Sequence, residues 1–548
     1  MNVTKDTIWY NGKFYTQDNA YPSCSAVYCR NGIIMAMGND DEILSLHPQG
    51  AVSVEKHDLK GNYVMPGFVD SHMHLLEYAE QENLIHLEDA HSFEDVLKLC
   101  QAEVPSAKKN HKWIRAVGFN QDDWNEKKLP TRKDLDRISA EVPITIRRIC
   151  LHVSVCNTKA MELMGLLDCP PKTDIENFGF YEDGTPNGII RESSQFLISD
   201  ALSPLTKDEI KNLIIYGCQK AAAKGIVEIH TDDFHSLPKE HGETIIAAYQ
   251  ELAKSDQLPI RIYEQCYLTD KNGLDIFLKE GHYTGETHGL FRIGPLKIVL
   301  DGSLGSHSAK MRKDYKNEPG QKGLSYYEQD ELYHYAKKAH DAGMQIAVHS
   351  IGDGSLEEML NVYDRIRWEN PRTDTRHGIV HCQIMDAAQQ DRFREMNLLG
   401  YVQPIFLRYD MNIVDDCVGS ELASQSYNWR RFLDEGVHLS GGSDCPVESF
   451  DIMENIQFAV SRTNFKEHKS WYPENAVTLE EAVKMFTYEG AFASFAEQTR
   501  GTISIGKEAD FAILNQDLFQ TPVDKINEVK VLETVVKGNI VFKSDDYS

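Results

Sequence analysis

The central part of the chain alternates short apolar segments with amphipathic helical segments, and this rhythm restricts the fold more than any other feature. Helical patterns such as 207–223 and 332–342 fall between several of the apolar segments. A strand-then-helix repeat implies parallel strands joined by crossover helices. The apolar segments, the first of which ends at His72, make eight strands, the number in a closed (β/α)8 TIM-like barrel. After the first, they are 225–229, 260–264, 296–300, 345–349, 378–381, 400–403 and 437–440.

Both ends of the chain are instead rich in short β-like segments separated by polar turns. Asn11-Gly12 and Asn31-Gly32 mark turns near the start, and Gly538-Asn539 marks one near the end. Because the two ends share this character and the centre does not, we expect residues 1–60 and 496–548 to form one small β-sandwich domain. Residues 61–495 would then form the barrel, giving an α/β protein.

One interval breaks the central rhythm. The stretch from His74 to Gly225 is far longer than the ~30 residues of a typical βα unit. Residues from about 80 to 205 are therefore predicted to be a large insertion after the first strand. Loops that follow barrel strands lie at the face where barrel enzymes carry their active sites. A lid or a substrate-selecting element is one hypothesis for the insertion, and passive bulk is an equal alternative.

Composition excludes some classes of partner. The chain has 57 Lys and Arg against 84 Asp and Glu, a net charge of −27, which argues against nucleic acid or an anionic membrane as a partner. The first residues lack the apolar core of a secretion signal, and no apolar stretch approaches the ~20 residues of a membrane span. The 11 cysteines, Cys169 among them, show no tight CxxC pair. We expect reduced thiols in a cytoplasmic protein.

Single polar residues recur at the ends of the predicted strands. His72 and His74 are two positions apart, so on a strand both imidazoles point to the same face. The carboxyl ends of barrel strands meet at one face, where nitrogen and oxygen ligands from several strands would hold one or two divalent cations. The residues concerned are His72, His74, Lys297, His349, His381 and Asp444.

Each of these residues also has a simpler explanation. Lys297 could form a salt bridge with Asp301 or with another carboxylate, because a buried lysine is costly without a partner. His349 could cap a following turn, and His381 could be an ordinary core histidine. Asp444 could make an Asx turn. The coincidence of all of them at successive strand ends favours the metal site.

Several motifs, taken together, resemble the amidohydrolase superfamily. Residues 66–74 (PGFVDSHMH) are similar to its strand-one motif, and residues 501–510 (GTISIGKEAD) are similar to a second hallmark. The resemblance covers nearly the whole chain and narrows to the amidohydrolase-3 group of YtcJ-like metal-dependent hydrolases. Its further motifs are 184–192 (GTPNGIIRE), 297–309 (KIVLDGSLGSHSA), 349–353 (HSIGD), 376–381 (RHGIVH), 403–404 (QP) and 442–447 (GSDCPV).

This resemblance implies a set of metal ligands. His72 and His74 would bind the more buried metal with Asp444, and His349 and His381 would bind a second. Lys297 would bridge both ions as a carboxylated lysine. Some members of the family use one metal, so one or two ions per chain remain open. Histidine and carboxylate ligands suit zinc, while iron and manganese remain alternatives.

The resemblance also directs attention to the substrate. The group often carries an Asp-Gly-His run in the insertion, where this chain has Cys150-Leu151-His152. His230 is a candidate contact too, although a solvated strand end is the favoured explanation for it. The predicted substrate contacts are His152, Arg191, Glu192 and Gln403.

The predicted function is hydrolysis of a non-peptide, amide-type carbon–nitrogen bond of a small molecule. A metal-activated hydroxide would attack the carbonyl carbon, and Asp444 would take the proton of the water and pass it to the leaving nitrogen. One alternative is a mononuclear deaminase of the same superfamily that uses His72, His74, His349 and Asp444. Another is a non-catalytic relative that binds a small ligand. The predicted assembly is a homodimer.

Overall fold

The computed structural model describes residues 5–46, 53–125, 127–150, 152–167, 175–237, 242–268, 271–545 and 547. Leu151 and Cys169, which the sequence analysis named, lie outside them. The chain divides into two compact units. The first comprises Met1–Leu75, Lys211–Phe234 and Gly242–Ser548. The second comprises Leu76–Ile210 and His235–His241.

The first unit contains the predicted barrel, which is confirmed as eight parallel strands. Neighbours in the sheet follow the order of the chain, and every neighbouring pair among the eight is parallel. A short strand, β17 (Thr287–His288), pairs antiparallel with one of them. The eight are β8 (Phe68–Met73), β15 (Ile226–Thr231), β16 (Arg261–Tyr267), β18 (Phe291–Val299), β19 (Ile346–Ser350), β20 (Gly378–His381), β21 (Leu399–Val402) and β22 (Leu439–Gly441).

Hydrogen bonds between the first and last strands bring the two edges of this sheet together. The Ser71 hydroxyl donates to the carbonyl of Gly441 at 2.8 Å. Just beyond, the amide of Asp444 donates to the carbonyl of His72 at 2.7 Å. The fit is tight, because a Cβ on Gly442 would lie 2.7 Å from the His72 amide nitrogen. This contact places Asp444 beside the strand that carries the two histidines.

Helices connect and extend the barrel strands. The predicted segments 207–223 and 332–342 correspond to α7 (Lys207–Ala222) and α10 (Gln329–Asp341). Other connecting helices are α8 (Gly242–Lys254), α9 (Lys271–Lys279), α11 (Asp353–Glu369), α12 (Ala387–Glu395) and α16 (Trp429–Asp434). Further elements are α13 (Leu407–Asp410), α14 (Val414–Val418), α15 (Ser420–Ala423), α17 (Ile452–Ser461), β23 (Thr463–Asn464), β24 (Lys469–Ser470), α18 (Leu479–Met485) and α19 (Tyr488–Ala493).

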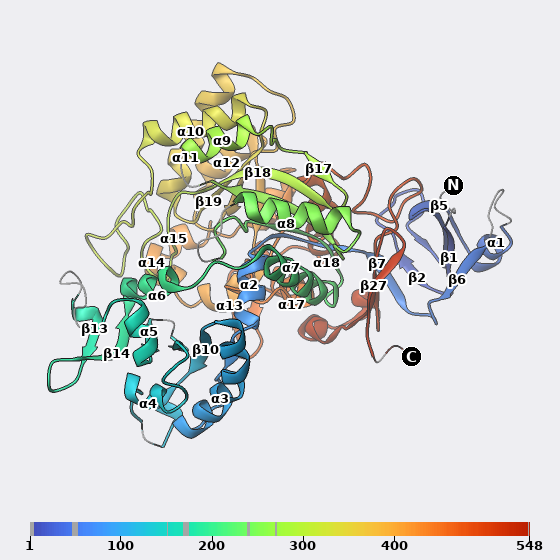
Figure 1. The fold of residues 1–548 in the computed structure, drawn as a ribbon. Helices are drawn as coiled ribbons and strands as arrows, with labels where there is room; N and C mark the ends of the chain where they lie inside the picture. Colours follow the sequence, from blue (N-terminus) through green and yellow to red (C-terminus); the bar gives the residue numbers. More distant parts are fainter. Residues whose placement is uncertain are drawn as a thin grey trace. The chain divides into compact units, whose positions relative to one another are not determined.

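The two ends of the chain form two further sheets in the same unit (Figure 1). The four-stranded sheet has the order β5 (Ile33–Gly38), β4 (Ala26–Arg30), β1 (Asp6–Tyr10) and β6 (Val54–Asp58), with α1 (Asp40–Leu44) after β5. The six-stranded sheet has the order β27 (Asn539–Lys543), β26 (Val531–Val536), β25 (Phe511–Leu514), β7 (Tyr63–Pro66), β2 (Lys13–Tyr15) and β3 (Ser23–Cys24).

Residues from both ends share one core in these sheets. Trp9 and Phe14 pack in the same buried cluster as Phe511 and Ile513. Strand β7 pairs with β25 from the far end of the chain, so the six-stranded sheet cannot form from either end alone. The domain boundaries at residues 60 and 496 stay predictions.

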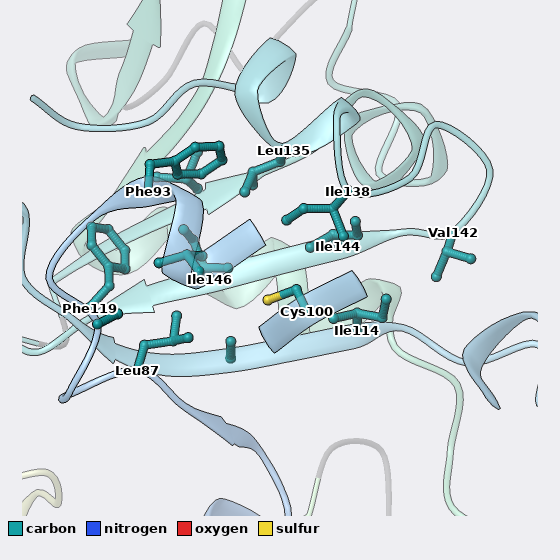
Figure 2. Close-up of a cluster of buried hydrophobic side chains, with 14 of the residues drawn as sticks. Leu87, Phe93, Cys100, Ile114, Phe119, Leu135, Ile138, Val142, Ile144 and Ile146 are labelled. Carbon is teal, nitrogen blue, oxygen red and sulfur yellow. The ribbon is translucent and has the colours of Figure 1, made fainter. Parts of the chain in front are cut away.

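The second unit has a sheet and a core of its own. The sheet order is β13 (Phe178–Phe180), β14 (Pro186–Arg191), β12 (Val153–Cys156), β11 (Ile144–Arg148), β10 (Ile114–Phe119) and β9 (Ile85–His86). Figure 2 shows Phe93 and Cys100 of one helix among isoleucines of these strands. The helices are α2 (Leu75–Glu82), α3 (Phe93–Asn110), α4 (Arg132–Asp136), α5 (Thr158–Leu163) and α6 (Phe196–Ala201). Both hypotheses for this segment, a lid or substrate-selecting element and passive bulk, stay open.

Two features bear on the expected environment of the protein. Within the described ranges, no helix combines the length and apolar character needed to cross a membrane. The ten cysteines that the structure describes are all free thiols. The cytoplasmic location stays a prediction.

Candidate metal centre

Three predicted ligands converge where the first and last barrel strands meet. One ligand atom each from His72, His74 and Asp444 lies within 4.8 Å of the others, the only such group found among the described residues. Asp444 Oδ1 is 3.1 Å from the Nε2 atoms of both histidines. Asp444 has a φ of 60°, in the left-handed region that non-glycine residues rarely occupy. Two imidazoles and a carboxylate are a suitable donor set for a divalent transition metal.

His72 is oriented by a glutamine that the sequence analysis did not single out. Its Nδ1 donates to Gln265 Oε1 at 3.0 Å, which leaves the Nε2 lone pair facing the centre. Burial, together with the charge of Lys297, lowers the pKa of His72 to about 4. The imidazole is therefore neutral near pH 7, the form that binds a metal.

Carboxylates flank His74 on both sides. Its Nδ1 donates to Asp232 and its Nε2 faces Asp444. Burial alone would lower the pKa of His74, but the charges and hydrogen bonds of Asp232 and Asp444 together outweigh it and raise the pKa well above its ordinary value. Burial would likewise raise the pKa of Asp444, but the contacts with the imidazoles of His72 and His74 hold it well below its ordinary value. Asp444 is therefore ionised.

Lys297 contacts this group from β18. The residue is 1% exposed, and its Nζ lies 2.9 Å from Asp232 Oδ2 and 3.2 Å from His72 Nε2. The simpler explanation of Lys297, a salt bridge with Asp301 or another carboxylate, is confirmed with Asp232 as the partner in place of Asp301. Asp301 instead accepts hydrogen bonds from the backbone amides of residues 351 and 352, at 3.0 and 2.9 Å.

His349 and His381 form a second pair of facing imidazoles. His349 Nδ1 lies 2.9 Å from His381 Nε2. The outer nitrogens face acceptors, with His381 Nδ1 at 2.9 Å from Gln403 Oε1 and His349 Nε2 at 3.4 Å from the carbonyl of Gly302. The inner nitrogens lie at hydrogen-bond distance from each other, and they are the ring atoms left to bind a cation beside the pair. The rings of His72 and His381 are 5.7 Å apart, so the two histidine groups adjoin.

The residues predicted to contact substrate have two different environments. Gln403 is buried and binds His381, as described above. In the second unit, His152 Nδ1 lies 3.0 Å from Glu192 Oε2, and both side chains are exposed. Arg191 ends β14 and pairs in register with Val153. Their contacts with substrate stay predictions.

His230 differs from the favoured expectation of a solvated strand end. The side chain is 0% exposed, and its Nε2 lies 3.2 Å from Glu228 Oε1. The two residues share one face of β15, since they are two positions apart. Burial therefore excludes the solvated position, and no other predicted site residue contacts this histidine in the interactions described.

The comparisons with known proteins agree with the geometry. The sequence model of the amidohydrolase family matches residues 55–542. YtcJ of Bacillus subtilis (strain 168), which carries the name amidohydrolase, is 27% identical over 540 residues, covering 98% of this chain and 99% of YtcJ. The N-substituted formamide deformylase of Arthrobacter pascens is 22% identical over 567 residues, covering 98% of each chain. An uncharacterized metal-dependent hydrolase from Pyrococcus horikoshii OT3 has a similar structure, with a TM-score of 0.78 and 26% identity over 95% of this chain and 99% of that one.

Proposed function

This chain belongs to the amidohydrolase family, and on that premise we propose that it hydrolyses an amide-type, non-peptide carbon–nitrogen bond of a small molecule with the help of divalent metal. The observation that supports this most is the group His72, His74 and Asp444, whose ligand atoms lie within 4.8 Å of one another at one end of the barrel. The coarser assignment, a metal-dependent hydrolase, agrees with the structural relative.

The donor atoms suit two adjoining ions. His72, His74 and Asp444 would hold one, and the facing nitrogens of His349 and His381 would hold the other, with zinc the expected metal. Lys297, whose Nζ lies 3.2 Å from His72 Nε2, would bridge them after carboxylation. A bound ion of this kind supplies a Lewis acid for the carbonyl oxygen and lowers the pKa of water.

Asp444 would move the proton in this reaction. Its carboxylate is ionised, and Oδ1 is the atom that both histidines approach. Asp444 Oδ1 takes a proton from the attacking water as the new carbon–oxygen bond forms. The same atom returns the proton to the nitrogen as the carbon–nitrogen bond breaks, so the products are a carboxylic acid and an amine.

Two observations support an N-formyl or N-acyl amine as the substrate. The relative from Arthrobacter pascens is named for the removal of formyl groups from N-substituted formamides and matches 98% of this chain. The facing nitrogens of His349 and His381 also provide a second pair of donors beside the first group, which favours two ions. The mononuclear deaminase alternative would place its single ion on His72, His74, His349 and Asp444.

A substrate panel tests the proposal. The protein is loaded with Zn²⁺ or stripped with a chelator and is then incubated with N-formyl amines, N-acyl amines and amino-substituted heterocycles. We expect release of amine from members of the first two classes, loss of this release on chelation and recovery on adding Zn²⁺ back. Ammonia released only from the heterocycles would establish the deaminase instead. No amine from any formamide or amide, with the metal fully loaded, would refute the proposal.

A further inference from the structure

Two buried glutamines on different strands contact two of the candidate ligands in the same way. Gln265 Oε1 accepts from His72 Nδ1 at 3.0 Å, and Gln403 Oε1 accepts from His381 Nδ1 at 2.9 Å. Gln265 is 0% and Gln403 is 3% exposed. Gln265 lies in β16 and Gln403 directly follows β21, so the two contacts arise independently around the barrel.

The far side of each amide is also held. Gln265 Nε2 donates to the carbonyl of Ser71 at 3.1 Å, and Gln403 Nε2 donates to the carbonyl of Tyr401 at 3.2 Å. A backbone carbonyl can only accept, so the NH2 end of each amide must face the strand and the oxygen must face the imidazole. Neither amide can flip without losing both hydrogen bonds.

This orientation determines the tautomer of each histidine. An amide oxygen accepts a hydrogen bond only from a protonated ring nitrogen, so Nδ1 carries the hydrogen in both imidazoles. Nε2 then keeps its lone pair, and in both residues Nε2 is the atom that faces the candidate centre. The other two imidazoles have different outer partners, the carboxylate of Asp232 for His74 and the carbonyl of Gly302 for His349.

We propose that Gln265 and Gln403 are positioning residues of the metal centre, which hold His72 and His381 in the tautomer and orientation that bind metal. The inference rests on the proposed function only in assuming that a divalent ion occupies this site. It assigns to Gln403 a role other than substrate contact. A hydrogen-bonded outer partner of this kind contributes about 10- to 100-fold to metal affinity.

The neutral amides also suit the charge of the site. Asp232 and Asp444 already place two buried carboxylates beside Lys297 and the histidines. Each further buried anion has a desolvation cost that must be offset by a partner. An amide oxygen accepts the same hydrogen bond from Nδ1 without adding that charge.

Metal titration of single variants tests the proposal. Zn²⁺ affinity and stoichiometry are measured by competition with a chromophoric chelator for Gln265→Leu, Gln403→Leu and the acceptor-retaining variants Gln265→Glu and Gln403→Glu. Gln345→Leu is the matched control. Gln345 is also a buried barrel glutamine, with Oε1 accepting from the Tyr263 hydroxyl at 2.7 Å. It contacts none of the candidate ligands in the interactions described.

We expect each leucine variant of Gln265 and Gln403 to weaken Zn²⁺ binding about 10- to 100-fold. Each glutamate variant keeps the acceptor but places its second oxygen against a backbone carbonyl, so it should bind Zn²⁺ more tightly than the matching leucine variant. Gln345→Leu should lower the melting temperature but leave Zn²⁺ affinity unchanged. With two ions, Gln265→Leu should affect one binding event and Gln403→Leu the other. Unchanged affinity in both leucine variants, or an equal loss in Gln345→Leu, would overturn the proposal.

Failure of the proposed function would look different. If no amide is hydrolysed but the leucine variants still bind Zn²⁺ weakly, the positioning role stands and the assigned reaction falls. A single binding event that both variants weaken would likewise support the positioning role, while removing the second ion from the proposed function.

Discussion

Replacing Asp444 by asparagine changes the chemistry of the centre while preserving its backbone. The Asp444 amide donates to the carbonyl of His72 at 2.7 Å, and its carbonyl accepts from the amide of Val447 at 2.9 Å. Both bonds survive the change. Asparagine also tolerates the φ of 60° at this position, where alanine would be strained. We therefore expect Asp444→Asn to fold like the parent protein.

The loss of activity follows from the position of one oxygen. Asp444 Oδ1 lies 3.1 Å from Nε2 of both His72 and His74, and an amide oxygen there can still act as a weak ligand. It cannot accept the proton of water, because a carboxamide is not a base at neutral pH. General-base catalysis contributes about 100- to 10,000-fold, which corresponds to about 3–5 kcal/mol of transition-state stabilisation.

The assay measures kcat/KM on the N-formyl or N-acyl amine that the panel identifies, with bound zinc determined in the same samples. The matched control is Asp451→Asn, since Asp451 is the N-cap of α17 and asparagine caps a helix equally well. We expect parent-like activity in the control and the loss above in Asp444→Asn. Full turnover by Asp444→Asn with metal bound would refute the base assignment.

Three further outcomes are expected. Lys297→Ala should bind less zinc per chain than the parent, and native intact-mass spectra should show one labile carboxyl group on the parent only. If the parent lacks this carboxyl group and Lys297→Ala is fully active, the bridging role of Lys297 is ruled out. Arg430 holds the pKa of Glu481 at about 2, below the ordinary 4.5, so the pair stabilises the fold above the unfolded pKa by on the order of 1 kcal/mol at this partly exposed site. Glu481→Gln should therefore lower stability at pH 7, and the difference from the parent should narrow as the pH falls from about 5 to about 2, as followed by urea unfolding; a constant difference would contradict this. Trp124 is 1% exposed, and its Nε1 donates to the carbonyl of Ala90 at 3.0 Å. Trp124→Ala should therefore lower the free energy of unfolding by about 3–5 kcal/mol, again measured by urea unfolding. A loss below about 1 kcal/mol would contradict its place in the core.

The barrel could be predicted because its evidence is local. Each strand is a short apolar run, and the runs recur with helical segments between them, so the period alone indicates parallel strands. The β-rich ends could be recognised in the same way. Pairing between them could not, because β7 and β25 are joined by hydrogen bonds between residues such as Val64 and Ile513, far apart in the sequence.

The candidate ligands were accessible to the same kind of argument. His72 and His74 are two positions apart on one strand, and Asp444 follows another strand end. Asp232 directly follows the end of β15, so the same signal could have found it. Gln265 carries no comparable pattern, because a glutamine in a buried strand becomes informative only when its partner is known, and Gln265 lies 193 residues from His72.

The amino-acid sequence by itself determined the barrel and the residue types gathered at its strand ends, because apolar periodicity and the alternation of side chains along a strand are properties of neighbouring residues. Only the tertiary structure decided that Lys297 faces Asp232 rather than Asp301, that His230 is buried, and that His72 and His381 each donate a hydrogen bond to a glutamine. Those contacts depend on the register between strands and on closure of the barrel at β8 and β22. Register and closure arise from packing of the whole sheet, and no single segment encodes them.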